Sequence, residues 1–344
     1  MRPRVSVLMP VRNGLPWLAD ALASLSRQTL QGFEIIVLED GSTDGTAEFL
    51  RTWRDDRLRI IRTGGIGMAG ALNIGLDAAR APLVARQDGD DVSSPIRLDA
   101  QSDYLARHPD VGVLATAADY IDAEGRIVAN AWVKTVRRQQ DVAVTPQQIA
   151  DLMPLTCCVT HGSVMARTDV LRAAGGYRAD IWPAEDYDLW LRLLSTTSIA
   201  KLPHRLYRYR VHDAQLSAQV REQQLTEALA AKLRYLRRVC PGLRSPARLV
   251  IVGEGRGAEA YSALAPAHGF EIVPLPAALA QRGPALPAHP TGKPSTGELY
   301  DVIVVANFAD LESYAEVFDA HGAGAMVRIG NFFMPRQDVR REAA

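Results

Sequence analysis

The residues with the clearest chemical potential are three carboxylates within four positions, Asp88, Asp90 and Asp91, with Gly89 after the first. Left unpaired, these groups would repel one another, and a hard divalent cation such as Mg²⁺ or Mn²⁺ would relieve that repulsion. Because Mg²⁺ usually binds one or two protein carboxylates together with substrate phosphates, the cluster favours a nucleoside diphosphate bridged to the protein by metal. The alternative is a solvated turn, since Asp and Gly both favour turns for backbone reasons.

Two further acidic groups raise the same question. Asp40 follows an apolar run, where it could cap the next helix or accept hydrogen bonds from a base N–H or a ribose hydroxyl. Glu185 and Asp186 open a segment in which Asp186, Leu189 and Leu193 have helical spacing. Acids interact well with a helix N-terminus, and that is the structural interpretation. The functional alternative is a general base whose pKa neighbouring carboxylates would raise and a bound metal would offset.

An alternation of strands and helices positions these acids in the first hundred residues. The pattern predicts strands at 5–9, 34–38, 58–62 and 83–86, helices at 15–30, 46–54 and 71–80, and a glycine-rich loop at 64–70. Repeated alternation of this kind indicates an α/β fold of βαβ units on a mainly parallel sheet. Asp40 and the cluster after position 86 should then face one crevice beyond the carboxyl ends of the strands.

The remainder of the chain predicts a second, smaller domain. Shorter strands are expected at 111–115, 126–129 and 162–166, a long helix at 218–239, and a new α/β pattern with strands at 248–252, 270–275, 301–306 and 326–329. Pro241-Gly242 and Ser245-Pro246 mark the boundary. The expected organisation is a first domain at 1–217, a connecting helix at 218–245, a Rossmann-like accessory domain at 246–334 and a tail at 335–344. Four prolines within 282–298 indicate a mobile loop.

Composition limits the possible functions. A length of 344 residues at about 150 per domain predicts roughly two domains. Lys+Arg and Asp+Glu both number 39, which argues against a dedicated nucleic-acid binder. An apolar content of 47% supports a globular core, and no segment has the length of a membrane span or the pattern of a signal peptide. Cys157, Cys158 and Cys240 are too few for a disulfide framework, so we expect a cytoplasmic protein.

The order and spacing of these motifs resemble the family 2 glycosyltransferases, which have the GT-A nucleotide-sugar-binding fold. The resemblance covers roughly residues 3–217. It is carried by Val5–Asn13, Gln28-Thr29, Phe33–Asp44, Ala71–Gly75, Asp88–Asp91 followed by Pro95 and Arg97-Leu98, His161–Ser163, Gly175–Tyr177, Glu185-Asp186, and Tyr209–His212 followed by Ser217.

The resemblance implies a role for each matching position. The nucleotide pocket should be lined by Pro10, Arg12 and Asp40, with Asp40 facing the base, and bordered by Asn73. Asp88 should approach the ribose, and the metal should be bound by Asp90 and His212. Asp186 should be the catalytic base, and the acceptor side should contain His161 and Glu185. Two positions depart from the family pattern. Glu39 replaces a common Asp, and Leu72 replaces a common Arg, so that a diphosphate contact is missing or supplied elsewhere.

The function so implied is inverting, metal-dependent sugar transfer from a nucleoside-diphosphate sugar to a hydroxyl acceptor, with Mg²⁺ or Mn²⁺ as cofactor. The acceptor would be a saccharide or a lipid-linked molecule in bacterial surface polysaccharide or glycolipid biosynthesis. The alternatives are a sugar nucleotidyltransferase and a non-catalytic nucleotide-sugar-binding protein. Residues 201–248 hold 11 basic and three acidic residues, which fits either a solvated helix face or peripheral contact with anionic lipid at the inner face of the plasma membrane. We favour the solvated face.

A glycine pattern in the second domain, Gly253, Gly255 and Ala258, matches the dinucleotide fingerprint G-x-G-x-x-A. A dinucleotide site also needs an acid near the end of the following strand to hold the ribose. That strand is expected to end in 273–276, which contains no acid, and Glu271 lies at its start. The sequence therefore favours a module used for packing or partner contact.

Overall fold

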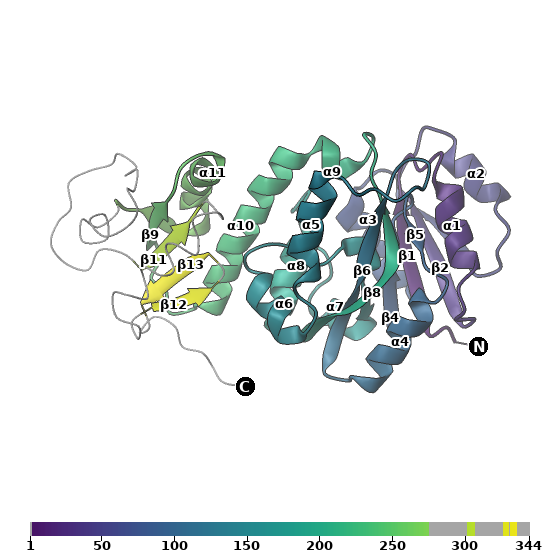
Figure 1. The fold of residues 1–344 in the computed structure, drawn as a ribbon, viewed down its shortest axis with the longest axis horizontal. Helices are drawn as coiled ribbons and strands as arrows, with labels where there is room; N and C mark the ends of the chain where they lie inside the picture. Colours follow the sequence, from purple (N-terminus) through teal and green to yellow (C-terminus); the bar gives the residue numbers. More distant parts are fainter. Residues whose placement is uncertain (1, 275–300, 307–325, 330, 336–344) are drawn as a thin grey trace. The chain divides into compact units, whose positions relative to one another are not determined.

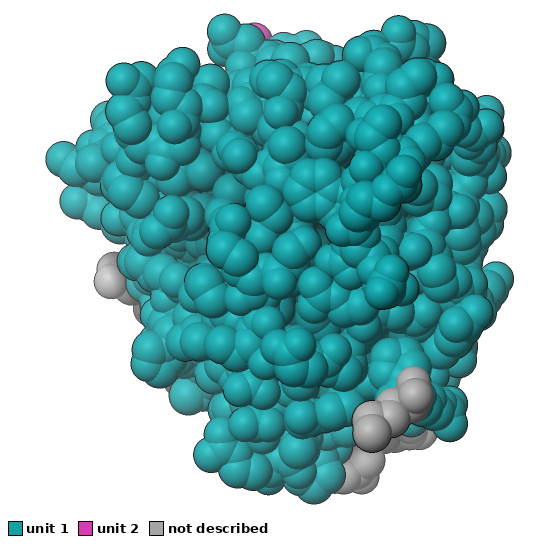
Figure 2. Space-filling model, turned by 90° about the vertical axis from the view of Figure 1, so that its right-hand side faces the viewer, with its two compact units in different colours: residues 1–224 teal, residues 225–344 magenta. Residues whose placement is uncertain are grey.

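The computed structural model describes residues 2–274, 301–306, 326–329 and 331–335 (Figure 1). The chain divides into two compact units, Met1–Gln224 and Leu225–Ala344. Figure 2 shows one face of the first unit with its side chains in space-filling form. Among the described residues, no helix is both long enough and apolar enough to cross a membrane.

The first unit is built on an eight-stranded sheet with the strand order β3-β2-β1-β4-β7-β6-β8-β5. The strands are β1 (Val5–Val11), β2 (Phe33–Glu39), β3 (Leu58–Arg62), β4 (Leu83–Arg86), β5 (Val92–Ser93), β6 (Val111–Ile121), β7 (Met165–Arg167) and β8 (Ser198–Arg210). The first four are mutually parallel, β7 is antiparallel to β4 and β6, β8 is parallel to β6, and β5 is antiparallel to β8. The prediction of an α/β fold with a mainly parallel sheet is therefore confirmed.

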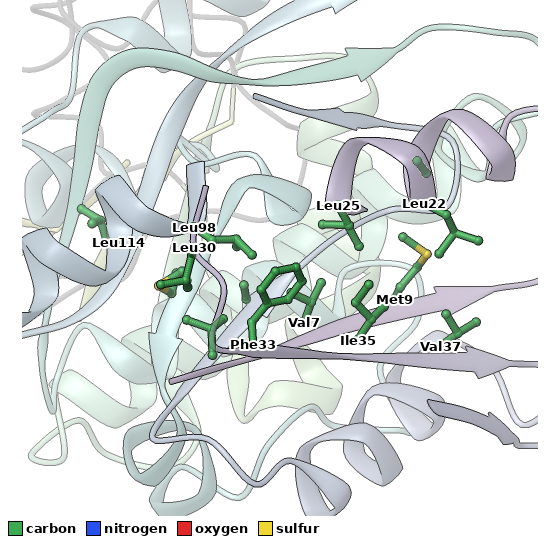
Figure 3. Packing of buried hydrophobic residues seen from close by; sticks show 14 of the residues in the cluster. Val7, Met9, Leu22, Leu25, Leu30, Phe33, Ile35, Val37, Leu98 and Leu114 are labelled. Atoms are coloured by element: carbon green, nitrogen blue, oxygen red, sulfur yellow. The ribbon is translucent and has the colours of Figure 1, made fainter. Parts of the chain in front are cut away.

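Helices flank this sheet (Figure 1). They are α1 (Leu18–Ser26), α2 (Thr46–Thr52), α3 (Met68–Ala78), α4 (Arg97–Arg107), α5 (Ala131–Asp141), α6 (Pro146–Leu152), the 3₁₀ helix η1 (His161–Ser163), α7 (Thr168–Ala173), α8 (Glu185–Leu193) and α9 (Leu216–Gln219). The apolar face of α1 presents Leu22 and Leu25 to side chains of β1 and β2, including Met9 and Ile35 (Figure 3). Every residue of β1 and β2 is buried, as expected for strands covered on both faces.

Close packing of α3 on the sheet depends on Gly75. A Cβ atom at this position would lie 2.7 Å from Cδ1 of Leu38 in β2, closer than packed carbon atoms approach. The helix therefore lies nearer to β2 than a larger residue would allow. The start of α3 lies beside the ends of β2 and β4, where the Gly67 N–H donates to Asp40 and the Met68 sulfur is 3.4 Å from Nη2 of Arg86.

Three predicted elements differ from the structure. The strand expected at 126–129 is not formed, because Asp122 accepts hydrogen bonds from the backbone N–H groups of Glu124 and Arg126 and closes a turn, which leaves one isolated bridge to Ile127. The strand expected at 162–166 is mostly η1, and β7 begins only at Met165. The helix expected at 15–30 is limited to Leu18–Ser26.

The longest strand, β8, is missing from the sequence analysis because its composition is unlike that of a buried strand. Its 13 residues include several basic side chains, and its middle part is exposed. Arg205 forms ion pairs with Asp141 at 2.6 Å and Asp119 at 3.7 Å, and β8 pairs along its length with β6 (Figure 1). Tertiary pairing thus overrides a weak local preference for strand.

The second unit contains a five-stranded sheet with the order β10-β9-β11-β13-β12. Most of α10 (Arg221–Val239), which begins in the last residues of the first unit, belongs to this second unit. Its other elements are β9 (Ala247–Val252), α11 (Arg256–Leu264), the 3₁₀ helix η2 (Pro266–His268), β10 (Phe270–Ile272), β11 (Val302–Val305), β12 (Met326–Ile329) and β13 (Phe332–Pro335). Strands β10, β9 and β11 are parallel, whereas β13 is antiparallel to its two neighbours. Helix α10 contributes Leu229, Leu233 and Leu236 to this core. The predicted loop at 282–298 lies outside the described residues, as does the predicted tail beyond Pro335.

Candidate active site

The predicted site residues are gathered at one edge of the large sheet by its topology. Strands β1, β2 and β4 are parallel, so the residues after them, Arg12, Asp40 and Asp88, lie at the same edge. Strand β7 runs antiparallel to β4, so His161 in η1, which precedes β7, lies there as well. This edge is where open α/β sheets bind ligands.

Asp40 is buried just after the end of β2, and residues 63–67, in the loop that follows β3, donate four hydrogen bonds to its carboxylate. Its Oδ1 accepts hydrogen bonds from the Thr63 hydroxyl at 2.6 Å and from the N–H groups of Gly65 and Ile66 at 2.9 and 2.8 Å. Its Oδ2 accepts one from the Gly67 N–H at 2.9 Å. Burial would raise the pKa of Asp40, but these four hydrogen bonds outweigh it and lower the pKa below 3.8. Asp40 therefore orders the glycine-rich loop, and contact between its carboxylate and a base remains a prediction.

The other residues predicted to line the nucleotide pocket differ in exposure. Pro10 is buried beside Leu38 of β2, whereas Arg12, beyond the end of β1, is exposed. The loop after β1 is bonded to the segment after β2, because the Asn13 side-chain oxygen accepts a hydrogen bond from the Thr43 N–H at 2.8 Å. Asn13 has a φ of 56°, in the left-handed region that Asn tolerates better than most residues.

The three carboxylates after β4 do not converge on one point. Asp88 pairs with Arg86 at 2.7 Å, and Oδ2 of Asp90 lies 3.0 Å from Nε2 of His212. The buried Asp91 accepts a hydrogen bond from the backbone N–H of Arg210 at 2.7 Å. Each carboxylate has its own partner, but the repulsion expected from the sequence persists, because burial and the negative charges of Asp90 and Asp88 raise the pKa of Asp91. Asp91 supports the end of β8 rather than joining a common metal site.

The fit of a metal can be tested on the Asp90–His212 pair. Within the described part of the chain, no group of three or more His, Cys, Asp or Glu side chains is placed to hold a metal ion. Two donor atoms 3.0 Å apart nevertheless match adjacent ligands of an octahedral ion, which lie about 3 Å apart when each bond is about 2.1 Å. The remaining ligands would be diphosphate oxygens and water, as is usual for Mg²⁺. The donor set therefore fits a metal that binds together with the nucleotide.

The imidazole of His212 is held from several sides. Its ring lies 3.9 Å from the Trp17 ring, and its backbone N–H donates to the Gln215 side chain at 2.9 Å. Its Nδ1 is buried and has no hydrogen-bond partner among the described residues. The ring is thus fixed with Nε2 directed at Asp90.

Glu185 and Asp186 form the first turn of α8, and both are short of hydrogen-bond donors. Oδ1 of Asp186 accepts a hydrogen bond from the Tyr187 N–H at 2.7 Å, and Oε2 of Glu185 is buried without a partner in the described residues. Burial raises the pKa of Glu185 to about 7, with the negative charge of Asp186 adding to the effect. Burial likewise raises the pKa of Asp186 to about 6.

Asp186 lies close enough to the end of β4 to feel its charges. The positive charge of Arg86 lowers the pKa of Asp186, and the negative charge of Asp88 raises it. Residues about a hundred positions apart in sequence therefore share one electrostatic environment. The acid expected to be the base and the acid expected to approach the donor are therefore within electrostatic range of each other.

A chain of contacts links α8 to α3. Trp190 of α8 is fully buried, and its ring is edge-on to His161 at 5.9 Å. Nε2 of His161 lies 2.9 Å from the Tyr177 hydroxyl. Asn73 of α3 clamps the Tyr177 backbone, donating to its carbonyl at 2.7 Å and accepting from its N–H at 2.9 Å. Asn73, predicted to border the nucleotide pocket, therefore also positions the catalytic side.

His161 is a neutral ring in this setting. Burial, followed by the positive charge of Arg86, holds the pKa of His161 well below its usual range. The Tyr177 phenol also remains neutral at pH 7, because burial raises its pKa. The pair offers hydrogen-bonding groups rather than charge beside Glu185 and Asp186.

Arg86 and Gly162 lie among the predicted site residues, although the sequence analysis assigned a role to neither of them. Arg86 ends an otherwise apolar strand directly before the acidic cluster, and that position was the available signal. Gly162 has no room for a side chain, since a Cβ atom there would collide with the Tyr207 hydroxyl and lie 2.5 Å from Oδ2 of Asp88. Leu72, by contrast, is fully buried in the core and contributes no charge to the site.

Comparison with known proteins gives a consistent assignment. Residues 6–171 match the family model described as Glycosyl transferase family 2. The putative glycosyltransferase EpsE of Bacillus subtilis is 32% identical over 196 residues, which are 55% of this chain and 66% of EpsE. The O-antigen biosynthesis glycosyltransferase WbnJ of Escherichia coli is 28% identical over 61% of this chain and 80% of its own length. The amylovoran biosynthesis glycosyltransferase AmsE of Erwinia amylovora is 29% identical over 56% of this chain and 70% of its own length.

Two solved structures share the fold. Staphylococcus aureus TarS 1–349 in complex with UDP-GlcNAc superposes with a TM-score of 0.55 at 20% identity, over 68% of this chain and 66% of that one. The mannosyltransferase PcManGT from Pyrobaculum calidifontis, in complex with GDP-Man and Mn²⁺, superposes with a TM-score of 0.52 at 19% identity, over 78% of this chain and 70% of that one. The match to EpsE spans about two thirds of its length, and the match to TarS 1–349 spans the same share. On these grounds residues 6–171 form a Glycosyl transferase family 2 domain, a family of enzymes, and the first unit has the GT-A fold.

Proposed function

We propose that this chain transfers a sugar from a nucleoside-diphosphate sugar to a hydroxyl group of a saccharide or lipid-linked acceptor, with inversion at the anomeric carbon. The observation that carries the proposal is Asp186, an under-bonded carboxylate with a pKa of about 6 that shares its environment with Asp88. Relatives named for O-antigen and amylovoran biosynthesis support assembly of a bacterial surface polysaccharide.

The donor would bind along the ends of β1, β2 and β4. Pro10, Arg12 and the loop ordered by Asp40 would line the nucleoside, and Asp88 would approach the ribose. Asp90 and His212 would hold a divalent cation together with the diphosphate. When bound, that ion would neutralise the negative charge that grows on the leaving nucleoside diphosphate.

Proton transfer would fall to Asp186. Its carboxylate would take the proton of the acceptor hydroxyl as the hydroxyl oxygen forms a bond to the anomeric carbon. The bond from that carbon to the diphosphate oxygen would break on the opposite face, so a single displacement inverts the configuration. A base with a pKa of about 6 is ionised at pH 7 and more basic than an ordinary Asp, which suits general base catalysis.

The alternatives have less support. A sugar nucleotidyltransferase usually has a glycine-rich, basic loop after its first strand, and the segment after β1 instead forms a turn through Asn13 that is bonded to Thr43. A non-catalytic binding protein would have no need of a buried Glu185 with an unpartnered oxygen beside a partly exposed Asp186 of raised pKa. Both alternatives predict that no sugar is transferred.

A donor screen tests the proposal. Release of UDP or GDP from a panel of nucleotide sugars is measured with candidate acceptors, with and without Mn²⁺, and NMR of the product reports the anomeric configuration. We expect one donor to be consumed in an acceptor-dependent way with inversion. Release of pyrophosphate instead would support the nucleotidyltransferase, and binding without turnover of any donor would support the non-catalytic protein.

The metal part of the proposal has its own test. Asp90→Ala should weaken nucleoside diphosphate binding in the presence of Mn²⁺ by about tenfold or more, with little change in its absence, because Asp90 would act through the ion. Titration calorimetry with and without Mn²⁺ measures both values. Asp110→Asn, a change at an exposed position away from the site, is the matched control. Equal loss of affinity in both conditions would contradict metal binding at Asp90.

A further inference from the structure

Trp17, directly before α1, is a partly buried aromatic residue that the proposed mechanism does not use. Its ring centroid lies 3.9 Å from that of His212, and the two ring planes are tilted by 32°. The side chain of His212 is only 8% exposed, and the indole lies against one face of its imidazole. The segment before α1 and the segment after β8 therefore meet at the proposed metal site.

The second nitrogen of the His212 ring does not orient it in the usual way. A histidine that binds a metal generally donates its other ring N–H to a carboxylate, a carbonyl or water, and this hydrogen bond fixes the ring. Nδ1 of His212 is buried and has no hydrogen-bond partner among the described residues. A metal ion at Nε2 would replace the 3.0 Å contact with Asp90, whereas stacking on Trp17 uses neither nitrogen. Stacking can therefore orient the ring both before and after an ion binds.

Trp17 is itself held by the protein. Its Nε1 donates a hydrogen bond to the Ala123 carbonyl at 3.0 Å, and the guanidinium of Arg210 lies 5.9 Å from its ring centroid. The buried Arg210 donates from Nη1 to the same Ala123 carbonyl at 2.9 Å and from Nε to the Asp90 carbonyl at 2.7 Å. The Ala123 carbonyl thus joins the indole to a guanidinium that also bonds the backbone of Asp90.

We propose that Trp17 is a positioning residue of the transfer reaction, which orients the His212 imidazole toward Asp90 and so sets how tightly a divalent cation binds with the diphosphate. This inference rests on the proposed function and deepens it. Asp90 and His212 are 122 positions apart in sequence, so their alignment depends on tertiary contacts such as this one. A ring that is already oriented lowers the entropic cost of binding the ion.

The experiment replaces Trp17 by Leu, which is apolar but has no ring face, and by Phe, which keeps a ring but cannot bond Ala123. UDP and GDP are titrated by calorimetry into the full chain with and without Mn²⁺, and the gain in affinity due to Mn²⁺ is recorded for the tighter nucleotide. We expect Trp17→Leu to reduce this gain by about tenfold or more, because losing a group that orients a metal ligand commonly weakens metal binding by about that much. Trp17→Phe should restore most of the gain, and affinity without Mn²⁺ should be unchanged in both variants.

The matched control is Trp53→Leu. Trp53 is a partly buried indole of the same unit, which packs against the hydrophobic core and lies 5.8 Å from the Phe49 ring. Its loss should lower the melting temperature but leave the gain from Mn²⁺ in place. A gain unchanged in Trp17→Leu, or reduced equally by Trp53→Leu, would overturn the inference. If Trp17→Leu does not fold, Trp17→Phe still decides, because a gain lost in Trp17→Phe would contradict a role for the ring face.

Failure of the proposed function gives a different result. A wild-type protein whose nucleotide affinity does not rise with Mn²⁺ would contradict the metal part of the proposed function, and the inference with it. A protein that loses the gain only in Trp17→Leu but transfers no sugar would support the inference and contradict the proposed function.

Discussion

Asp40 and Asp186 are both poorly exposed carboxylates of the N-terminal unit, yet their surroundings are opposite. Asp40 accepts four hydrogen bonds from the loop after β3, and its pKa is lowered even though burial opposes this. Asp186 accepts one hydrogen bond from the Tyr187 N–H, and burial raises its pKa to about 6. The number of donors around a carboxylate, more than its burial, separates an acid that organises structure from one poised to take a proton.

The two acids should therefore contribute to stability with opposite sign. The folded pKa of Asp40 is below its ordinary 3.8, so its stabilisation is present above that pH and is lost as the pH falls further. The folded pKa of Asp186 is raised to about 6, so its ionised form costs stability at pH 7, and this cost disappears as the pH falls toward 4. Substitutions at the two positions can break or sharpen this comparison.

The largest effect is expected for Asp186→Asn. Loss of a general base should lower kcat by about a thousandfold, while donor affinity stays close to that of the wild type. The melting temperature at pH 7 should be equal or higher, because the costly buried charge is gone. Steady-state kinetics, calorimetry and thermal unfolding measure these three quantities.

A matched control lies two residues along the same helix. Asp188 pairs with Arg192 at 2.8 Å, so Asp188→Asn should lower the melting temperature and leave kcat of the folded protein nearly unchanged. If Asp186→Asn turns over donor at the wild-type rate, Asp186 is not the base. If it instead unfolds at a lower temperature, Asp186 belongs with Asp40 as a structural acid.

Asp40→Asn should have an intermediate effect, mainly a lower free energy of unfolding. The amide nitrogen cannot accept a hydrogen bond, so at least one backbone N–H of the 63–67 loop loses its partner. We expect a loss of about 2 kcal/mol in the free energy of unfolding at pH 7, measured by urea denaturation. The loss should shrink as the pH falls below about 4, because Asp40 of the unfolded chain becomes protonated there while folded Asp40, with its lowered pKa, does not. A full loss that persists at pH 3 would contradict the assigned role of its charge.

The sequence predicts local features of this chain better than long-range ones. The parallel strands and the turns after them were predictable, because apolar runs followed by Asp and Gly are local signals. The same holds for the second unit, where Gly253 and Gly255 adopt φ values of 102° and 83° before α11, as a glycine turn requires. That turn follows an apolar strand without an acidic cluster, so a glycine pattern by itself does not make a site like the one in the first unit.

The partners of most of these acids were not predictable, because they come from distant segments; only the family resemblance implied that Asp90 and His212 lie together. Nothing local indicates that Asp90 would meet His212 or that Asp91 would bond Arg210 at the end of an unpredicted strand. The clamp of Asn73 on Tyr177 joins residues 104 positions apart. Sequence spacing proposes candidate acids, but only tertiary pairing decides which of them keep an unsatisfied charge.

The smallest effect is expected for Glu185→Gln, which keeps the size of the side chain and removes a negative charge beside Asp186. Because the base must be ionised, the rate should fall on the acid side as the pH passes below the coupled range of about 6 to 7. Glu185 has a pKa of about 7 and is mostly protonated where Asp186 ionises, at about 6, so the neutral Gln should leave the acid limb of the kcat profile within about half a pH unit of the wild type. At pH 7 the rate should change less than twofold, since Asp186 is already ionised there. An acid limb that moves down by a pH unit or more would mean that Glu185 is already ionised where Asp186 titrates. Its charge, rather than burial, would then account for the raised pKa of Asp186 on which the contrast with Asp40 depends.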